Sequence, residues 1–323
     1  MGKLLLTLAI IFVSLALGYG VRYFTQCNGL LLAEVRLTVL RQRLQSLALF
    51  GLLPAAAMLS LWGLPSPTPS LLALPLLGLM AWLWGGVQAL LAARFLKLDR
   101  SQTGSLYCCG TFTNVGAVGT LVCVLFYGEN AIALAALYRL CEELFYYSVA
   151  FPVARRFTPV DDKPQLTCGG MHLGPVLGIA VSALLCGILL NLLQISRPLW
   201  CGVLSSGIMI LATVFLLFAI GLSLRPSQMF HYRRQSMAVC LIKFIGTPLL
   251  VICMARLMGY AEMDGGLPLK VTAILSAMPV AMTALVPPSL FRLDLDMANA
   301  CWMFSTLALI VVLPVLMTLL PLL

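Results

Sequence analysis

Long runs of apolar residues recur along the chain and constrain its fold more than any other feature. Leu4–Leu17 and Ile208–Leu222 are two examples, and neither contains a charged residue. A helix needs about 20 mainly apolar residues to cross a bilayer. Neither run alternates apolar and polar residues with the period of two that a strand of a membrane barrel would show. The runs therefore predict membrane-spanning helices rather than a barrel.

The overall composition leads to the same class of protein. Hydrophobic residues make up 61% of the chain and charged residues only 10%, whereas an ordinary soluble domain has roughly 25% charged residues. A soluble protein of 323 residues could not bury so much apolar surface and keep a wettable exterior. In lipid, every backbone polar group must be satisfied within the protein. We therefore expect an all-α polytopic membrane protein in contact with the lipid bilayer.

The apolar segments predict about ten spans arranged as two inverted five-helix repeats. The predicted spans are 4–20, 45–63, 70–94, 104–127, 129–154, 171–194, 199–223, 236–258, 266–290 and 297–322. The polar stretch 155–170 is the expected cytoplasmic connector, so that the repeats occupy 1–154 and 171–323. Lys3 and the run after it also have the pattern of a signal peptide, but Gly18-Tyr19-Gly20 is a poor cleavage site, which favours a retained span.

The basic residues are distributed unevenly between the two sets of loops. Loops after the odd-numbered spans contain Arg22, Arg36, Arg41, Arg43, Arg94, Lys97, Arg100, Arg155, Arg156, Lys163, Arg225, Arg233, Arg234 and Arg292, and the opposite loops contain Lys3, Arg197, Arg256 and Lys270. Because cytoplasmic loops of membrane proteins are enriched in Lys and Arg, both termini are expected on the non-cytoplasmic side of the cell membrane. The same bias explains the net charge of +9 without a nucleic-acid partner.

Two predicted spans contain residues that disfavour an uninterrupted helix. The segment from Gly110 to Thr120 is rich in glycine and threonine, and Pro279 lies inside the span 266–290. Asn114 and Pro279 are 165 residues apart, so the two irregular segments occupy matching positions in the two predicted repeats. Broken helices free backbone groups that can bind a substrate near the middle of the bilayer. The alternative is that the glycines only permit close helix packing and the proline only kinks its helix.

The same two segments resemble a known family of transporters. Phe112-Thr113-Asn114-Val115-Gly116-Ala117-Val118-Gly119 resembles the N-x-G-x-x-G segment of the auxin efflux carrier family, which includes bacterial malate and malonate permeases. The remaining matches to the family pattern are Lys243 with Pro248, Ala277-Met278-Pro279-Val280-Ala281, Leu293-Asp294-Leu295-Asp296-Met297-Ala298, Ser305-Thr306 and Leu313-Pro314. One difference is that Thr120 and Leu121 follow Gly119, where the family usually has a proline.

The resemblance implies a fold and an activity. It implies ten helices in two inverted repeats, with helices 4 and 9 broken and crossing, and transport of organic anions. The substrate-binding candidates that it implies are Thr113, Asn114, Gly116, Met278, Pro279 and Val280.

Charged residues inside predicted spans are the second group of candidates, because buried charges are retained mostly when they are paired or functional. Glu142 and Glu143 follow Arg139 by three and four residues, so both can reach it on one face of a helix. They are interpreted either as an anion contact with a proton-titrating glutamate or as a structural patch that neutralises itself. Asp296 either lines a cavity or complements the helix dipole, and Lys243 is interpreted as a snorkelling lysine near a helix end.

No arrangement typical of an enzyme or a metal site is present in the sequence. The 11 cysteines form no C-x-x-C pair, and no Ser-His-Asp or His-Glu-x-x-His pattern occurs. We therefore expect neither catalysis nor a cofactor or metal. The leading hypothesis is a permease that carries a small organic anion by alternating access, with protons as the favoured coupling ion and a homodimer left open. The alternative is a membrane-embedded sensor or scaffold that retains the fold without transport.

Overall fold

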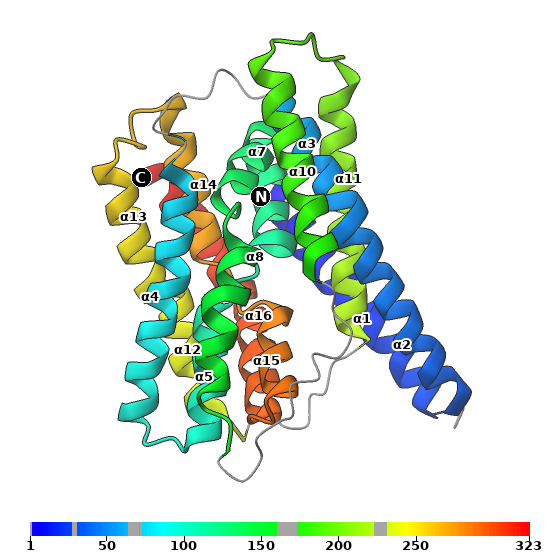
Figure 1. Cartoon of the computed structure of the whole chain (residues 1–323), viewed down its shortest axis with the longest axis vertical. Coiled ribbons are helices and arrows are strands. Elements are labelled where there is room, and N and C mark those ends of the chain that lie inside the picture. Colours follow the sequence, from blue (N-terminus) through cyan, green and yellow to red (C-terminus); the bar gives the residue numbers. More distant parts are fainter. Residues whose placement is uncertain (1, 28–30, 64–70, 72, 160–172, 223–230) are drawn as a thin grey trace. The chain divides into compact units, whose positions relative to one another are not determined.

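The computed structural model describes residues 2–27, 31–63, 71, 73–159, 173–222 and 231–323. These residues form helices and turns, and the β-structure among them is an isolated bridge (Figure 1). The α-helices are α1 (Gly2–Cys27), α2 (Leu31–Ser46), α3 (Leu53–Trp62), α4 (Leu74–Phe95), α5 (Arg100–Thr111), α6 (Thr120–Tyr127), α7 (Glu129–Tyr138), α8 (Glu142–Phe145), α9 (Phe151–Arg155), α10 (Leu173–Leu192), α11 (Trp200–Gly221), α12 (Arg233–Leu241), α13 (Thr247–Leu257), α14 (Leu267–Ser276), α15 (Val286–Leu290) and α16 (Leu295–Leu319). The all-helical class predicted from the apolar runs is confirmed.

Tighter and wider turns join several of these helices. The π-helical segments are η1 (Leu47–Leu52), η3 (Val115–Gly119), η4 (Tyr146–Ala150) and η6 (Ile242–Gly246). The 3₁₀ segments are η7 (Asp264–Gly266), η8 (Met282–Leu285) and η9 (Leu320–Leu322).

Helices long and apolar enough to cross a membrane occur throughout the described part of the chain. Five segments meet this condition, namely Leu5–Thr25, Leu74–Phe95, Trp200–Gly221, Arg233–Leu257 and Leu295–Leu322. Two shorter apolar helical segments are Leu53–Trp62 and Val115–Tyr127. The prediction of a membrane-embedded helical protein is thus supported, whereas the number of ten spans and the inverted repeat stay predictions.

The chain packs as two compact units, each made from three separate stretches of sequence. Unit 1 comprises Met1–Thr68, Gly116–Ala136 and Gly174–Leu224, and unit 2 comprises Pro69–Val115, Leu137–Leu173 and Arg225–Leu323. Each unit takes helices from both predicted repeats. The division into units describes which helices pack together and does not test an internal repeat, so the repeat boundaries remain a prediction. Most of the expected connector, from residue 160 to residue 170, lies outside the described residues.

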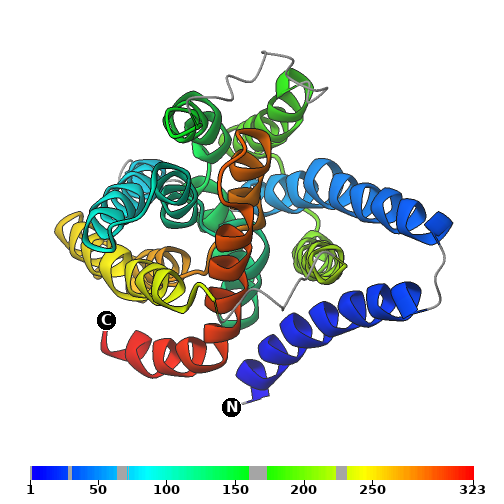
Figure 2. The ribbon, with the colours of Figure 1, turned by 90° about the horizontal axis from the view of Figure 1, so that it is seen from below.

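Unit 1 is built around α11, which Figure 2 shows nearly end-on between α1 and the α2–α3 segment. The backbones of α1 and α11 approach closely where Gly18 meets Gly221, because a Cβ added at Gly18 would lie 2.2 Å from the carbonyl oxygen of Phe218. Small residues at such a crossing let two membrane helices pack without side chains between them. The fully buried Ala56 and Ala212 belong to the apolar core of this unit.

Unit 2 packs α4 against α5 and α13, and α12 against α16 (Figure 1). Gly85 of α4 faces Gly110 of α5, and a Cβ added at Gly85 would lie 2.3 Å from the Gly110 carbonyl oxygen. Gly110, at the start of the predicted break, therefore also allows α4 and α5 to pack closely. The centroid of the buried Trp82 ring lies 5.9 Å from that of the Phe145 ring and 5.6 Å from that of the Tyr146 ring. These rings add an aromatic cluster to the core.

Three of the π-helical segments immediately precede a helix with proline in its first turn. These prolines are Pro54 after η1, Pro152 after η4 and Pro248 after η6. Proline lacks an N–H and its ring clashes with the carbonyl four residues earlier, so the preceding turn must widen. Local chemistry thus explains why these helices are not regular. It does not explain η3, which no proline follows.

One predicted span is interrupted at a place that the sequence did not indicate. The sequence predicts one span over 129–154, but α7 ends at Tyr138 and the helix resumes at Glu142. The turn between them closes with hydrogen bonds from Leu140 N to Leu137 O at 3.1 Å and from Glu142 N to Arg139 O at 2.9 Å. Residues Arg139 to Cys141 contain neither glycine nor proline, so no local breaker marked this interruption.

Candidate functional site

The two predicted helix breaks meet within unit 2. After α5 ends at Thr111, Phe112 adopts an extended conformation (φ −77°, ψ 122°). After α14 ends at Ser276, the chain is extended again at Ala281 (φ −74°, ψ 152°). Thr113 and Val280 form an isolated antiparallel bridge. The two interruptions, far apart in the sequence, therefore run side by side as short extended segments.

The bridge is held by two backbone hydrogen bonds. Asn114 N donates to Pro279 O at 2.8 Å, and Ala281 N donates to Phe112 O at 3.2 Å. Pro279 explains the second break, because it has no N–H and disfavours a helical conformation at the residue before it. The first break forms without a proline, at a threonine and an asparagine, which have lower helix propensity than the alanine and leucine of a regular span.

Side chains satisfy the N–H groups that point outward from the bridge. Tyr146 OH accepts a hydrogen bond from Thr113 N at 3.2 Å. Ser305 Oγ accepts one from Val280 N at 3.2 Å and donates to Trp302 O at 3.0 Å. An unsatisfied buried backbone group would cost about 1–3 kcal/mol, so these two side chains stabilise the crossing. Tyr146 carried no sequence signal, whereas Ser305 was part of the closing pattern in the family resemblance.

A buried lysine lies against the same bridge. Lys243 Nζ donates to Thr113 Oγ1 at 2.8 Å, and the residue is only 1% exposed. It projects from the π-helical segment η6 that precedes Pro248, and such segments occur often at functional sites. The interpretation of Lys243 as a snorkelling residue is therefore wrong, because a snorkelling lysine keeps its charged end in water. Within the described residues, Lys243 takes part in no ion pair.

Five of the six predicted substrate-binding residues come together at the bridge. Thr113 and Asn114 are 3% and 8% exposed, and Met278, Pro279 and Val280 are buried on the facing segment. The sixth, Gly116, lies in η3 at the beginning of the second stretch of unit 1. A set of residues from two distant parts of the sequence thus forms a single buried cluster.

The charged residues of the fifth predicted span form a local ion pair. Arg139 Nε lies 2.7 Å from Glu142 Oε2, and the Glu142 side chain is almost fully buried. This geometry corresponds to the self-neutralising patch as far as Arg139 and Glu142 are concerned, since these two opposite charges pair across the turn between α7 and α8. The side chain of Glu143 lies outside what the structure describes.

Asp296 lies at an exposed position in the first turn of α16. Its neighbour Asp294 caps that helix by accepting a hydrogen bond from Met297 N at 2.9 Å, and it also accepts one from Tyr232 OH at 3.1 Å. Burial and the nearby Asp294 carboxylate raise the pKa of Tyr232 to about 12. The structure therefore places Asp296 at a helix start and not at the bridge.

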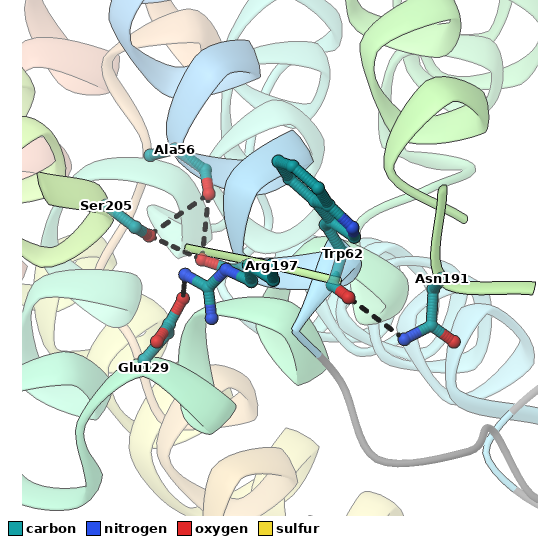
Figure 3. A network of polar contacts seen from close by, with 7 residues as sticks. Ala56, Trp62, Glu129, Asn191, Arg197 and Ser205 are labelled. Carbon is teal, nitrogen blue, oxygen red and sulfur yellow. Dashed lines mark hydrogen bonds and ion pairs between the residues drawn. The ribbon is translucent and has the colours of Figure 1, made fainter. Parts of the chain in front are cut away.

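Unit 1 contains a separate polar network, shown in Figure 3. Arg197 forms an ion pair with Glu129 at the start of α7. Asn191 Nδ2 donates to Trp62 O at 3.1 Å, and Ser60 and Ser205 are hydrogen-bonded at 2.6 Å. These contacts join the end of α3 to α10 and α11, and the segment between α10 and α11 to the start of α7, so we interpret the network as structural.

Comparison with known proteins adds no further assignment. No protein-family model matches the chain, and no curated protein matches it in a sequence search. Among the described residues, no group of three or more His, Cys, Asp or Glu side chains is arranged to hold a metal ion.

Proposed function

We propose that this protein is a secondary transporter of a small organic anion, and that the substrate binds at the bridge between the two broken helices. The observation that carries the proposal is the antiparallel pairing of Thr113 with Val280. Extended backbone inside a membrane protein is tolerated where it is enclosed by protein or lines a cavity, and transporters use such broken helices to build substrate sites.

Two further observations support the finer parts of the proposal. The bridge joins the segments that resemble the auxin efflux carrier family, at the place where that resemblance implies a crossing of helices 4 and 9. Helices also occur in each of the predicted span ranges, as far as these lie within the described residues. The full proposal therefore includes about ten spans in two inverted repeats.

The backbone groups of the bridge are largely used by the protein itself. The N–H groups of residues 113, 114, 280 and 281 all donate within unit 2. Substrate contacts must therefore come mainly from side chains at the bridge, and we take Asn114, whose amide has two N–H donors and an acceptor oxygen, as the main candidate. Alternating access requires movement of one bundle of helices relative to another, which would open the site to each side in turn.

Uptake into proteoliposomes tests the substrate site. The wild-type protein should accumulate radiolabelled malate or malonate with saturation, and Asn114→Ala should lower this uptake at least tenfold. Asn130→Ala is the matched control, because Asn130 is an exposed amide at the start of α7. Unchanged saturable uptake by Asn114→Ala would refute the proposed site.

Two added conditions separate the remaining hypotheses. With protons as the coupling ion, an imposed pH gradient should drive accumulation, a protonophore should abolish it, and sodium should have no effect. If ligand binding is found without uptake under any gradient, the alternative of a sensor or scaffold replaces transport.

A further inference from the structure

Lys243 is a deeply buried lysine at the bridge, and it has no role in the substrate contacts proposed above. The ammonium group carries three N–H donors. One of them reaches Thr113 Oγ1 at 2.8 Å, and the residue is 1% exposed. No carboxylate within the described part of the chain pairs with it. A hydroxyl group can accept a hydrogen bond from the ammonium but cannot neutralise its charge.

Arg139, a partly buried cation of unit 2, behaves differently. Arg139 is paired with Glu142, three residues further along the chain, and such pairing is the usual solution for a charge inside a membrane protein. Burying an ion without a counter-charge is unfavourable, and replacing it with a neutral residue of similar volume is often neutral or stabilising. Stability therefore does not explain a lysine at this position. A transported anion explains it, because the anion would provide the missing counter-charge while it is bound.

We propose that Lys243 is the counter-charge for the carboxylate of the transported anion. This inference rests on the proposed function. The carboxylate accepts hydrogen bonds from the donors of Nζ that Thr113 does not use. Charge-assisted hydrogen bonds of this kind are among the strongest in proteins.

A single buried cation also sets the preferred charge of the substrate. It compensates one negative charge, so a second carboxylate on the same molecule would stay without a partner at this position. The site should therefore favour a monoanion, either a monocarboxylate or a dicarboxylate with one of its groups neutral, over a neutral analogue of the same shape.

A series of three compounds of nearly equal size separates charge from shape. Malonate carries two carboxylates, malonamate carries one carboxylate and one amide, and malonamide carries two amides. Ligand-induced shifts in thermal unfolding of the purified full chain measure binding of each compound. Wild-type protein should bind malonamate at least as well as malonate and about 10- to 100-fold more tightly than malonamide, the range expected for one hydrogen-bonded charge.

Lys243→Gln tests the role of the charge, and Lys270→Gln is its matched control. Lys270 makes its side-chain hydrogen bond to Gly265 O, away from the bridge. In Lys243→Gln, the affinity for malonamate should fall to that for malonamide, and the unliganded variant should unfold at a temperature equal to or above that of the wild type. Lys270→Gln should keep the preference for the charged compound. Lys243→Met provides a second neutral variant.

The outcomes distinguish this inference from the proposed function. If Lys243→Gln unfolds at a lower temperature and still prefers malonamate, Lys243 is structural, and the inference is overturned while anion transport stands. If the wild-type protein binds neither compound that carries a carboxylate and transports none of a wider panel of small carboxylates, both the inference and the proposed function are overturned.

Discussion

Replacement of Gly18 by alanine should destabilise unit 1, because it places a methyl group between α1 and α11. The new Cβ would lie 2.2 Å from Phe218 O, 2.9 Å from Gly221 Cα and 3.0 Å from Leu222 N. All three are backbone atoms, so no side-chain rotation relieves the overlap. Ordinary van der Waals contact begins at 3.4 Å, which leaves a shortfall of 1.2 Å at the Phe218 carbonyl. The two helices must separate by about that distance.

The expected magnitude follows from two opposing effects. Overpacking a well-packed site costs about 1–3 kcal/mol, and the upper part of this range applies because backbone blocks the methyl group. Alanine is the better helix former by about 1 kcal/mol. The net loss in the free energy of unfolding should therefore be about 1–2 kcal/mol.

Gly20→Ala is the matched control on the same helix. A Cβ at Gly20 would meet nothing within 4 Å, so only the gain in helix propensity remains, and the free energy of unfolding should rise by up to about 1 kcal/mol. Thermal unfolding in detergent can be followed with a thiol-reactive fluorophore. The buried thiols of Cys123 and Cys201 in unit 1 become accessible when the unit opens.

The result that would refute this reasoning is equal unfolding temperatures for Gly18→Ala and Gly20→Ala. That outcome would mean that α1 and α11 do not pack in backbone contact. A further check is Gly221→Ala, whose Cβ would lie 2.3 Å from Leu15 O. The double variant with Gly18→Ala and Gly221→Ala should lose less free energy of unfolding than the sum of the two single losses, because the helices need to separate only once.

Two other substitutions test local contacts. Asp294→Ala removes the cap of α16 and should lower the free energy of unfolding by about 1 kcal/mol. Asp296→Ala, at an exposed position of the same turn, should lower it by less than about 0.5 kcal/mol. Equal effects of the two variants in chemical denaturation would contradict the assigned cap. Glu129→Gln leaves Arg197 without its counter-charge and should cost about 1–2 kcal/mol, below the value for a fully buried pair because both side chains are partly exposed. Recovery of stability in the double variant Glu129→Gln with Arg197→Gln would support this, and no recovery would show that the ion pair does not carry the effect.

Several features of this protein were determined by its sequence alone, because their causes act within a few residues. The apolar runs predicted helices that can cross a membrane, since backbone groups in lipid must bond within their own segment. Pro279 predicted a broken helix, because its missing N–H acts on the preceding turn. The widened turns before Pro54, Pro152 and Pro248 have the same local cause.

Other features were decided only by tertiary structure, because they depend on which distant segments meet. The pairing of Thr113 with Val280 sets a register between segments that no local propensity specifies. The interruption after Tyr138 lacks any residue that breaks a helix by itself. Lys243 shows the difference most clearly. Its place in an apolar span near Pro248 is visible in the sequence, which favours a snorkelling lysine. Only the packing of α5, α12 and α16 in unit 2 shows that its charged end lies enclosed at the bridge, bonded to Thr113, because burial depends on the neighbours that the fold brings to a side chain.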